Sequence, residues 1–110
     1  MNAAASRLPD APDTPAATIA GLAKALGHPA RIAILEMLAR RDVCVGCDIV
    51  EEIGLAQSTT SEHLRVLKAA GIVVGEIERP RVCYSLNAEA LAPLAAFIAH
   101  VSAGPAEVPA

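Results

Sequence analysis

Aromatic residues are scarce in this chain, at 2% of 110 residues, with one tyrosine, one phenylalanine and no tryptophan. The interior must therefore be built from leucine, isoleucine, valine and alanine, and the hydrophobic fraction as a whole is 54%. That apolar content in so short a chain fits one domain with a modest core. The surplus predicts a second buried surface, most simply a dimer interface.

An excess of positive charge is also missing, because the formal net charge is −3. This argues against a nonspecific polyanion binder, but it leaves site-specific DNA binding open, since local charge decides. Locally the balance reverses between residues 64 and 81. There Glu76 and Glu78 stand against a larger set of cations, namely Arg65, Lys68, Arg79 and Arg81.

Long apolar runs are absent, and the pattern of a secretory leader is not apparent near residue 1. The longest apolar stretch, near residues 90–101, is interrupted by Pro93 and His100. It is too short to span a bilayer, so we expect a cytoplasmic chain without membrane contact. Three cysteines form an odd set, and in a reducing compartment they are thiols or metal ligands rather than a disulfide framework. No nucleophile–base constellation or phosphate loop is visible, so no catalysis is expected.

Residues 1–15 and 104–110 are rich in proline and alanine and are predicted to be a disordered arm and tail around a domain at 16–103. Apolar periodicity and turn residues predict helices over 19–26, 29–41, 49–53, 57–70 and 91–101, a short strand at 42–45, and a hairpin of 72–77 and 82–86 with a basic tip at 78–81. At the start of the third of these helices, Asp48 and Glu51 resemble a capping box. The fourth helix has two possible starts, Gln57 and Thr59. This order predicts a winged helix-turn-helix: mainly α, with about five helices, two to three short strands and a small β-hairpin wing. The amphipathic first and last helices are the candidates for a homodimer interface.

The fourth helix has the composition of a DNA reader. Its apolar stripe contains Leu64, Leu67 and Thr60, whereas Ser58 and Thr59 lie on the opposite face. Short polar side chains let a helix enter the major groove and reach base edges and phosphates. The candidate DNA contacts are Gln57, Ser58, Thr59 and Ser61 for base edges or phosphates, Arg65 and Lys68 for the backbone, Arg79 and Arg81 at the wing tip, and His63, for which a structural role is an equal alternative.

The cysteines form a second candidate site. Strand alternation turns Cys44 and Cys83 away from the core, and pairing of their strands would make them cross-strand neighbours. Cys47 lies beside Asp48 at a predicted helix N-terminus, where the dipole stabilises a thiolate. Three converging thiols suit a soft acceptor. In the alternative, Cys83 is merely a small strand residue.

Several segments together resemble the ArsR/SmtB family of winged-helix metalloregulators: His28-Pro-Ala-Arg-Ile32, Cys44-Val-Gly-Cys-Asp48, Gln57-Ser-Thr-Thr-Ser-Glu-His-Leu64, Leu67-Lys-Ala-Ala-Gly-Ile72 and Val82-Cys-Tyr-Ser-Leu86. The resemblance implies a homodimeric repressor that leaves its operator when a metal or metalloid binds. The cysteine segment is similar to the arsenic-sensing branch, whose pattern is Cys-Val-Cys-Asp. This chain departs from the family by the inserted Gly46, by Val50 in place of a further cysteine, by Glu62 in place of a common Arg, and by Thr60 in place of Val.

The hypothesis is therefore a repressor that needs no cofactor to bind operator DNA and is released when As(III) or Sb(III), or another soft ion, binds Cys44, Cys47 and Cys83. The main alternative is a redox or persulfide sensor that closes a Cys44–Cys47 disulfide. A thiol oxidoreductase would want a βαβ setting, which is missing. A winged-helix protein adaptor is disfavoured by the hydroxyl-rich helix face.

Overall fold

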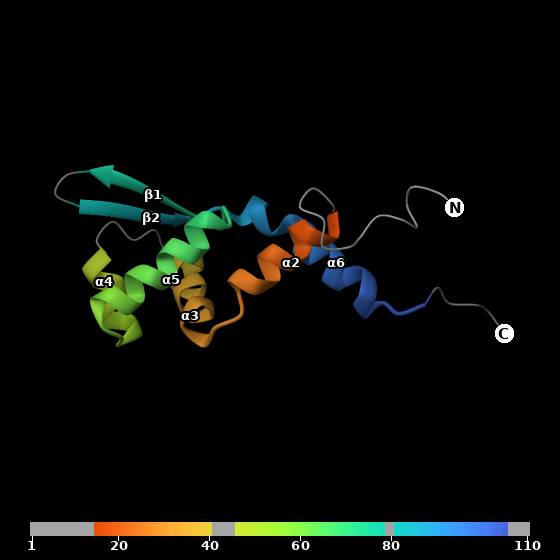
Figure 1. Ribbon diagram of the computed structural model, residues 1–110, viewed down its shortest axis with the longest axis horizontal. Coiled ribbons are helices and arrows are strands. Elements are labelled where there is room, and N and C mark those ends of the chain that lie inside the picture. The colour runs from red at the N-terminus through yellow and green to blue at the C-terminus, as the bar shows by residue number, and fades with distance from the viewer. Residues whose placement is uncertain (1–14, 41–45, 79–80, 106–110) are drawn as a thin grey trace.

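The computed structural model describes residues 15–40, 46–78 and 81–105. The order of its elements is α2 (Pro15–Ala25), α3 (Pro29–Arg40), α4 (Gly46–Ile53), α5 (Gln57–Ala69), β1 (Val73–Glu78), β2 (Arg81–Leu86), a short 3-10 helix η1 (Ala88–Leu91) and α6 (Ala92–Ser102). Helices α3, α4 and α5 gather at one end of the molecule with the hairpin beside them, and α2 packs with α6 at the other (Figure 1). This is the predicted mainly helical winged helix-turn-helix.

The core lies where α3 crosses behind α5. Ile34 and Met37 of α3 and Leu67 of α5 are fully buried, and Ile49 of α4 joins them. Helix α3 begins at Pro29, as predicted, because proline suits the first position of a helix, where its missing N–H is not needed. It is central, although Ile32 remains 42% exposed.

The third predicted helix begins earlier than expected. Helix α4 starts at Gly46 rather than at Ile49, so Asp48 lies in its first turn instead of capping it. An acidic residue is favourable in either position, because both lie near the positive end of the helix dipole, and the sequence pattern does not separate the two. Arg40 at the end of α3 forms an ion pair with Glu52 of α4 and joins these two helices.

Helix α5 begins at Gln57, the earlier of the two predicted starts, and the Thr60 N–H donates to the carbonyl of Ala56 over 2.9 Å. It ends at Ala69, and Gly71, two residues later, has a φ of +79°, the left-handed conformation that favours glycine. The N–H groups of Gly71 and Ile72 donate to the carbonyls of Lys68 and Leu67 over 2.9 and 3.0 Å. This Schellman motif satisfies the last carbonyls of the helix and turns the chain into β1.

The wing is an antiparallel hairpin with Val73 opposite Leu86 and Glu78 opposite Arg81. Its strands reach further than predicted, so residues 78 and 81 belong to the strands and not to the tip. Antiparallel pairing continues along the ladder while partners remain, which extends both strands to the turn.

The predicted arm and tail fall largely on residues 1–14 and 106–110, outside the described residues, and so does the predicted strand at 42–45; α2 begins at Pro15, the last residue assigned to the arm. No helix in the described ranges is long and apolar enough to cross a membrane.

Candidate nucleic-acid interface

The exposed face of α5 carries the predicted reading residues. Gln57, Ser58, Thr59 and Ser61 are exposed and all lie in the first two turns of the helix. The opposite side is closed by Thr60, Leu64 and Leu67, which are at most 4% exposed. The N-terminal half of α5 therefore presents short hydrogen-bonding side chains on a helix that is anchored from behind.

Two elements hold α5 in this position. Gly54, with φ of +80°, ends α4 and allows the tight turn through Leu55 and Ala56 into α5. Helices α3 and α4 both pack against α5, and β1 follows α5 after a short turn, so α5 lies beside the wing (Figure 1). This is the arrangement in which a recognition helix enters the major groove.

Arg65 is exposed, but its guanidinium is paired with the carboxylate of Glu62. Its Nε donates to both carboxylate oxygens of Glu62 over 3.1 Å, and Nη2 contacts Oε2 as well. The hydrogen bond from Arg65 lowers the pKa of Glu62, and the same bond raises the pKa of Arg65, so both side chains stay ionised. Any phosphate that approached this guanidinium would have to compete with the carboxylate of Glu62.

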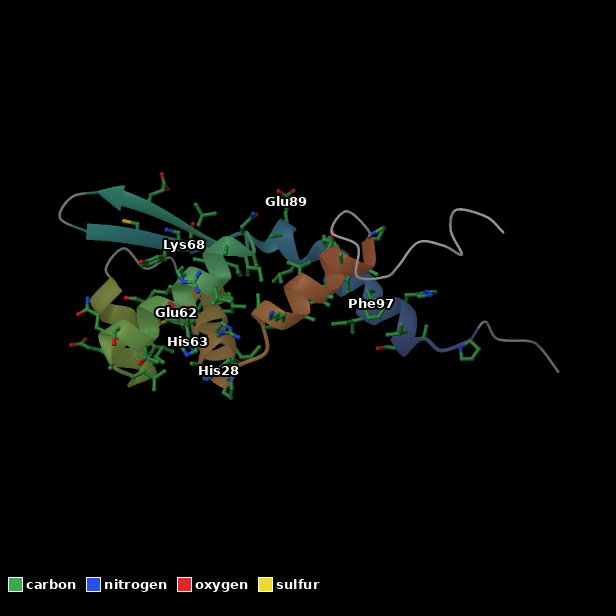
Figure 2. All side chains as sticks on the ribbon, viewed as in Figure 1. His28, Glu62, His63, Lys68, Glu89 and Phe97 are labelled. Atoms are coloured by element: carbon green, nitrogen blue, oxygen red, sulfur yellow. The ribbon has the colours of Figure 1, made fainter. Side chains whose placement is uncertain are left out.

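Lys68 lies at the end of α5 that faces the hairpin (Figure 2). A Cβ placed on Gly75 of β1 would lie 3.2 Å from both Lys68 Nζ and Tyr84 Cε1. The missing side chain of Gly75 therefore makes room for the lysine to cross the wing. Sequence reasoning did not single out Gly75, although a glycine inside a strand is a known sign of close approach.

His63 is 8% exposed and does not share the exposed face of α5. Its Nδ1 lies 3.2 Å from Nη1 of Arg31, and its ring centroid lies 4.3 Å from that of His28 (Figure 2). Burial first, and then the charges of His28 and Arg31, lower the pKa of His63, while Glu62 opposes them. Of the two alternatives for His63, its burial supports the structural one.

The predicted wing contacts are only partly described. Arg79 lies outside the described residues, and Arg81 is placed by its backbone opposite Glu78. Residue 81 therefore begins β2, and its contact with DNA stays a prediction.

The predicted thiol site is also only partly described. Cys44 lies outside the described residues, Cys47 is placed by its backbone in the first turn of α4, and Cys83 is half-buried in β2 opposite Glu76. Helix α4 and strand β2 are in contact. Among side chains that the structure describes, no three from His, Cys, Asp and Glu come together in a way that could hold a metal ion.

The fold and this surface define a winged helix-turn-helix protein with a polar recognition helix. Comparison with known proteins identifies its family: the family model "Bacterial regulatory protein, arsR family" matches residues 28–74. The HTH-type transcriptional regulator Rv0081 of Mycobacterium tuberculosis is 42% identical over 73 residues, which cover 66% of this chain and 64% of the relative. The regulator YgaV of Escherichia coli is 32% identical over 82 residues, covering 74% of this chain and 83% of YgaV.

Solved structures agree. The crystal structure of M. tuberculosis Rv0081 matches with a TM-score of 0.61 and 38% identity over 76% of this chain and 84% of that chain. The solution NMR structure of Mb0332 from Mycobacterium bovis, described as a homodimeric winged helix-turn-helix DNA-binding domain and a possible ArsR-family regulator, matches with a TM-score of 0.63 and 30% identity over 78% and 79% of the two chains. The chain belongs to the ArsR family of transcriptional regulators, which are not enzymes. It spans 64% of the first of these curated relatives and 47% of another, the repressor SmtB of M. tuberculosis.

Proposed function

We propose that this protein is a cytoplasmic, homodimeric repressor that binds operator double-stranded DNA through the first two turns of α5 and the wing. The observation that carries the proposal is the row of exposed Gln57, Ser58, Thr59 and Ser61 on a helix whose other face is buried. Hydroxyl and amide groups hydrogen-bond base edges and phosphates, and Arg65, Lys68, Arg79 and Arg81 supply the positive charge.

The dimer of the proposal uses α2 and α6. Phe97, Ile98 and Val101 of α6 are 43–51% exposed, although they are large and apolar. Phe97 and Leu94 also border an apolar hollow against Ile19 of α2. A second copy that covers this surface would place two reading helices about 34 Å apart, one turn of DNA. Mb0332, which is described as homodimeric, is a precedent in the same fold.

The effector of the proposal is trivalent arsenic or antimony bound by Cys44, Cys47 and Cys83. Contact between α4 and β2 supports it, because these elements carry Cys47 and Cys83. Three thiolates neutralise a trivalent, thiophilic centre. Binding would draw the wing toward the start of α4, directly before the reading helix, and a coupling of about 1–3 kcal/mol per site would weaken DNA binding roughly 5- to 150-fold.

DNA binding is tested by fluorescence anisotropy with labelled duplexes that tile the region upstream of the gene for this chain. Thr59→Glu places a carboxylate on the reading face and is expected to weaken binding by about tenfold or more, since each 1.4 kcal/mol is tenfold. The matched control, Ala96→Glu, adds the same charge on the exposed side of α6 that is turned away from Leu94 and should bind like the wild type. Equal affinity of the two variants would contradict the assignment of α5 as the reader.

Release is tested by adding arsenite, antimonite or Zn(II) to the DNA complex of the wild type and of single Cys→Ser variants. We expect arsenite and antimonite to release the wild type, and Cys44→Ser and Cys47→Ser to keep the complex intact. If Cys83→Ser left the DNA at the same metalloid concentration as the wild type, Cys83 would not be a ligand. A DNA complex that neither arsenite nor antimonite dissociates would contradict the proposed effector.

The second candidate, a redox or persulfide sensor, depends on the Cys-x-x-Cys spacing of Cys44 and Cys47. Polysulfide under controlled reducing conditions would then release DNA where arsenite does not. Mass spectrometry would find an intramolecular Cys44–Cys47 disulfide or a persulfide bridge in the released protein.

A further inference from the structure

Arg31 joins three helices through one guanidinium. It belongs to α3, yet Nε donates to the carbonyl of Ala25 over 2.6 Å and Nη2 to that of Lys24 over 3.4 Å, both at the C-terminal end of α2. The remaining nitrogen, Nη1, lies 3.2 Å from Nδ1 of His63 on α5. A cation at the end of α2 also complements the helix dipole there.

The geometry decides the tautomer of His63. A guanidinium only donates hydrogen bonds, so Nδ1 of His63 must accept and carries no proton. The neutral ring then has its proton on Nε2. His28, whose Nδ1 accepts the Ala30 N–H over 3.0 Å, packs its ring against that of His63 (Figure 2).

We propose that Arg31 and His63 are positioning residues for DNA binding: their hydrogen bond sets the reading helix α5 against α2, and protonation of His63 breaks it. The inference rests on the proposed function, in which α2 helps to form the dimer interface and α5 reads DNA. The separation of the two reading helices in a dimer depends on the angle between these two helices. No other described hydrogen bond joins the α2–Arg31 unit to a side chain of α5.

The charges around His63 set the direction of the effect. His28 and Arg31 face it from the start of α3 and Glu62 adjoins it on α5. A protonated His63 cannot accept from Arg31 and places a second cation against the guanidinium. Because the folded chain holds the pKa of His63 below the ordinary 6.5, protonation sets in below that pH and opposes the native contact.

The sign of the pH dependence separates this effect from general electrostatics. Acidification makes a protein more positive and ordinarily strengthens its binding to a polyanion. Here we expect DNA affinity to fall by about tenfold between pH 7.5 and 5.5, the equivalent of about 1.4 kcal/mol. His63→Gln keeps a neutral acceptor for Arg31 at every pH, so its affinity should match the wild type at pH 7.5 and should hold or rise at pH 5.5.

The experiment measures anisotropy across this pH range for the wild type, His63→Gln, Arg31→Met and the matched control His100→Gln, with circular dichroism to follow folding. His100 is exposed on α6, so its variant should keep the wild-type profile. Arg31→Met should bind DNA weakly already at pH 7.5, and its DNA affinity should not fall further on acidification. An unchanged profile in His63→Gln would overturn the proposal.

Nuclear magnetic resonance provides a readout that needs no DNA. Imidazole nitrogen shifts should show the Nε2–H tautomer of His63 at pH 7.5, and Arg31→Met should lose that preference. The amide resonances of Ser58 and Ser61 should move with the titration of His63 in the wild type and stay still in His63→Gln. If the chemical shifts behave as expected but the protein binds DNA at no pH, the Arg31–His63 contact is correct and the proposed function is wrong. If the chemical shifts do not behave as expected, the positioning role is wrong.

Discussion

Thr60 is a polar residue in a place that its neighbours make apolar. It is 1% exposed in the stripe of α5 that Leu64 and Leu67 continue, and its Oγ1 has no hydrogen-bond partner among the described residues. A buried hydroxyl without a partner costs roughly 1–3 kcal/mol. The same residue stands where the resemblance to the family leads one to expect valine.

Thr60→Val should therefore stabilise the fold by about 1 kcal/mol, because it replaces the unsatisfied hydroxyl with a methyl of similar size. Chemical denaturation monitored by circular dichroism measures the change. Thr59→Val makes the same substitution at an exposed neighbour and should change the free energy of unfolding by less than about 0.5 kcal/mol. A loss of stability in Thr60→Val would show that the hydroxyl has a partner after all.

Glu62 restrains the charge of Arg65 on the face that we assign to DNA. Glu62→Gln removes the anion and frees the guanidinium, so we expect DNA affinity to rise severalfold and the logarithmic salt dependence to steepen by about one unit if Arg65 gains a phosphate. The control Glu89→Gln removes the same charge from η1, apart from Glu62 (Figure 2). A gain shared by both variants would be a net-charge effect rather than release of Arg65.

At the scale of elements, the reading helix and the wing are joined by one short turn. Gly71 follows the last turn of α5. The side-chain amide of Asn87, the residue after β2, donates to the carbonyl of Gly71 over 3.1 Å. Thus the end of the helix and both strands of the wing meet at one point.

Gly71→Ala should destabilise the fold by about 1–2 kcal/mol, since the left-handed φ of +79° disfavours a Cβ. Among the described residues other than its two chain neighbours, no atom lies within 4 Å of the added Cβ, so the cost is conformational and not steric. Gly21→Ala, inside α2 and also in open space, should have the opposite sign, up to about 1 kcal/mol, because alanine favours helices. Thermal and denaturant unfolding of both variants check the pair, and equal signs would contradict the argument.

At the scale of the whole molecule, two ends have different surfaces. At the end with α5 and the wing, the exposed large apolar residues Ile32 and Val74 lie on different elements, whereas α6 leaves Phe97, Ile98 and Val101 open on one helix. Figure 2 shows Phe97 on α6, remote from the reading helix. An apolar patch on a small chain is typical of an interface, which links the composition to the proposed dimer.

Phe97→Glu should convert the dimer to a monomer and weaken DNA binding, because a carboxylate in an apolar interface is strongly unfavourable. Analytical ultracentrifugation measures the mass, and anisotropy measures the binding. Ala96→Glu places the same charge on an exposed neighbour turned away from Leu94 and should leave the mass unchanged. A wild-type protein that sediments as a monomer at all concentrations would exclude the homodimer.

Features that depend on neighbours in the chain were predicted correctly. Pro29 begins α3 and Gly71 follows the end of α5, since each acts through its own backbone conformation, and the structure selects Gln57 over Thr59 as the start of α5. The period of 3.6 residues also predicted that Thr60 would be buried with Leu64. The predicted start of α4, at Ile49, was wrong, because both Gly46 and Asp48 are compatible with the N-terminus of a helix.

What the sequence determined by itself is thus the order of the elements, the buried and exposed faces of α5, and the membership of a family that its local motifs already indicated. Only the tertiary structure decided that Arg31 spans α2 and α5 through His63, and that Gly75 accommodates Lys68. The physical reason is range. Turn chemistry and helical periodicity act over a few residues, whereas a guanidinium that meets an imidazole 32 positions away does so only after the helices have packed.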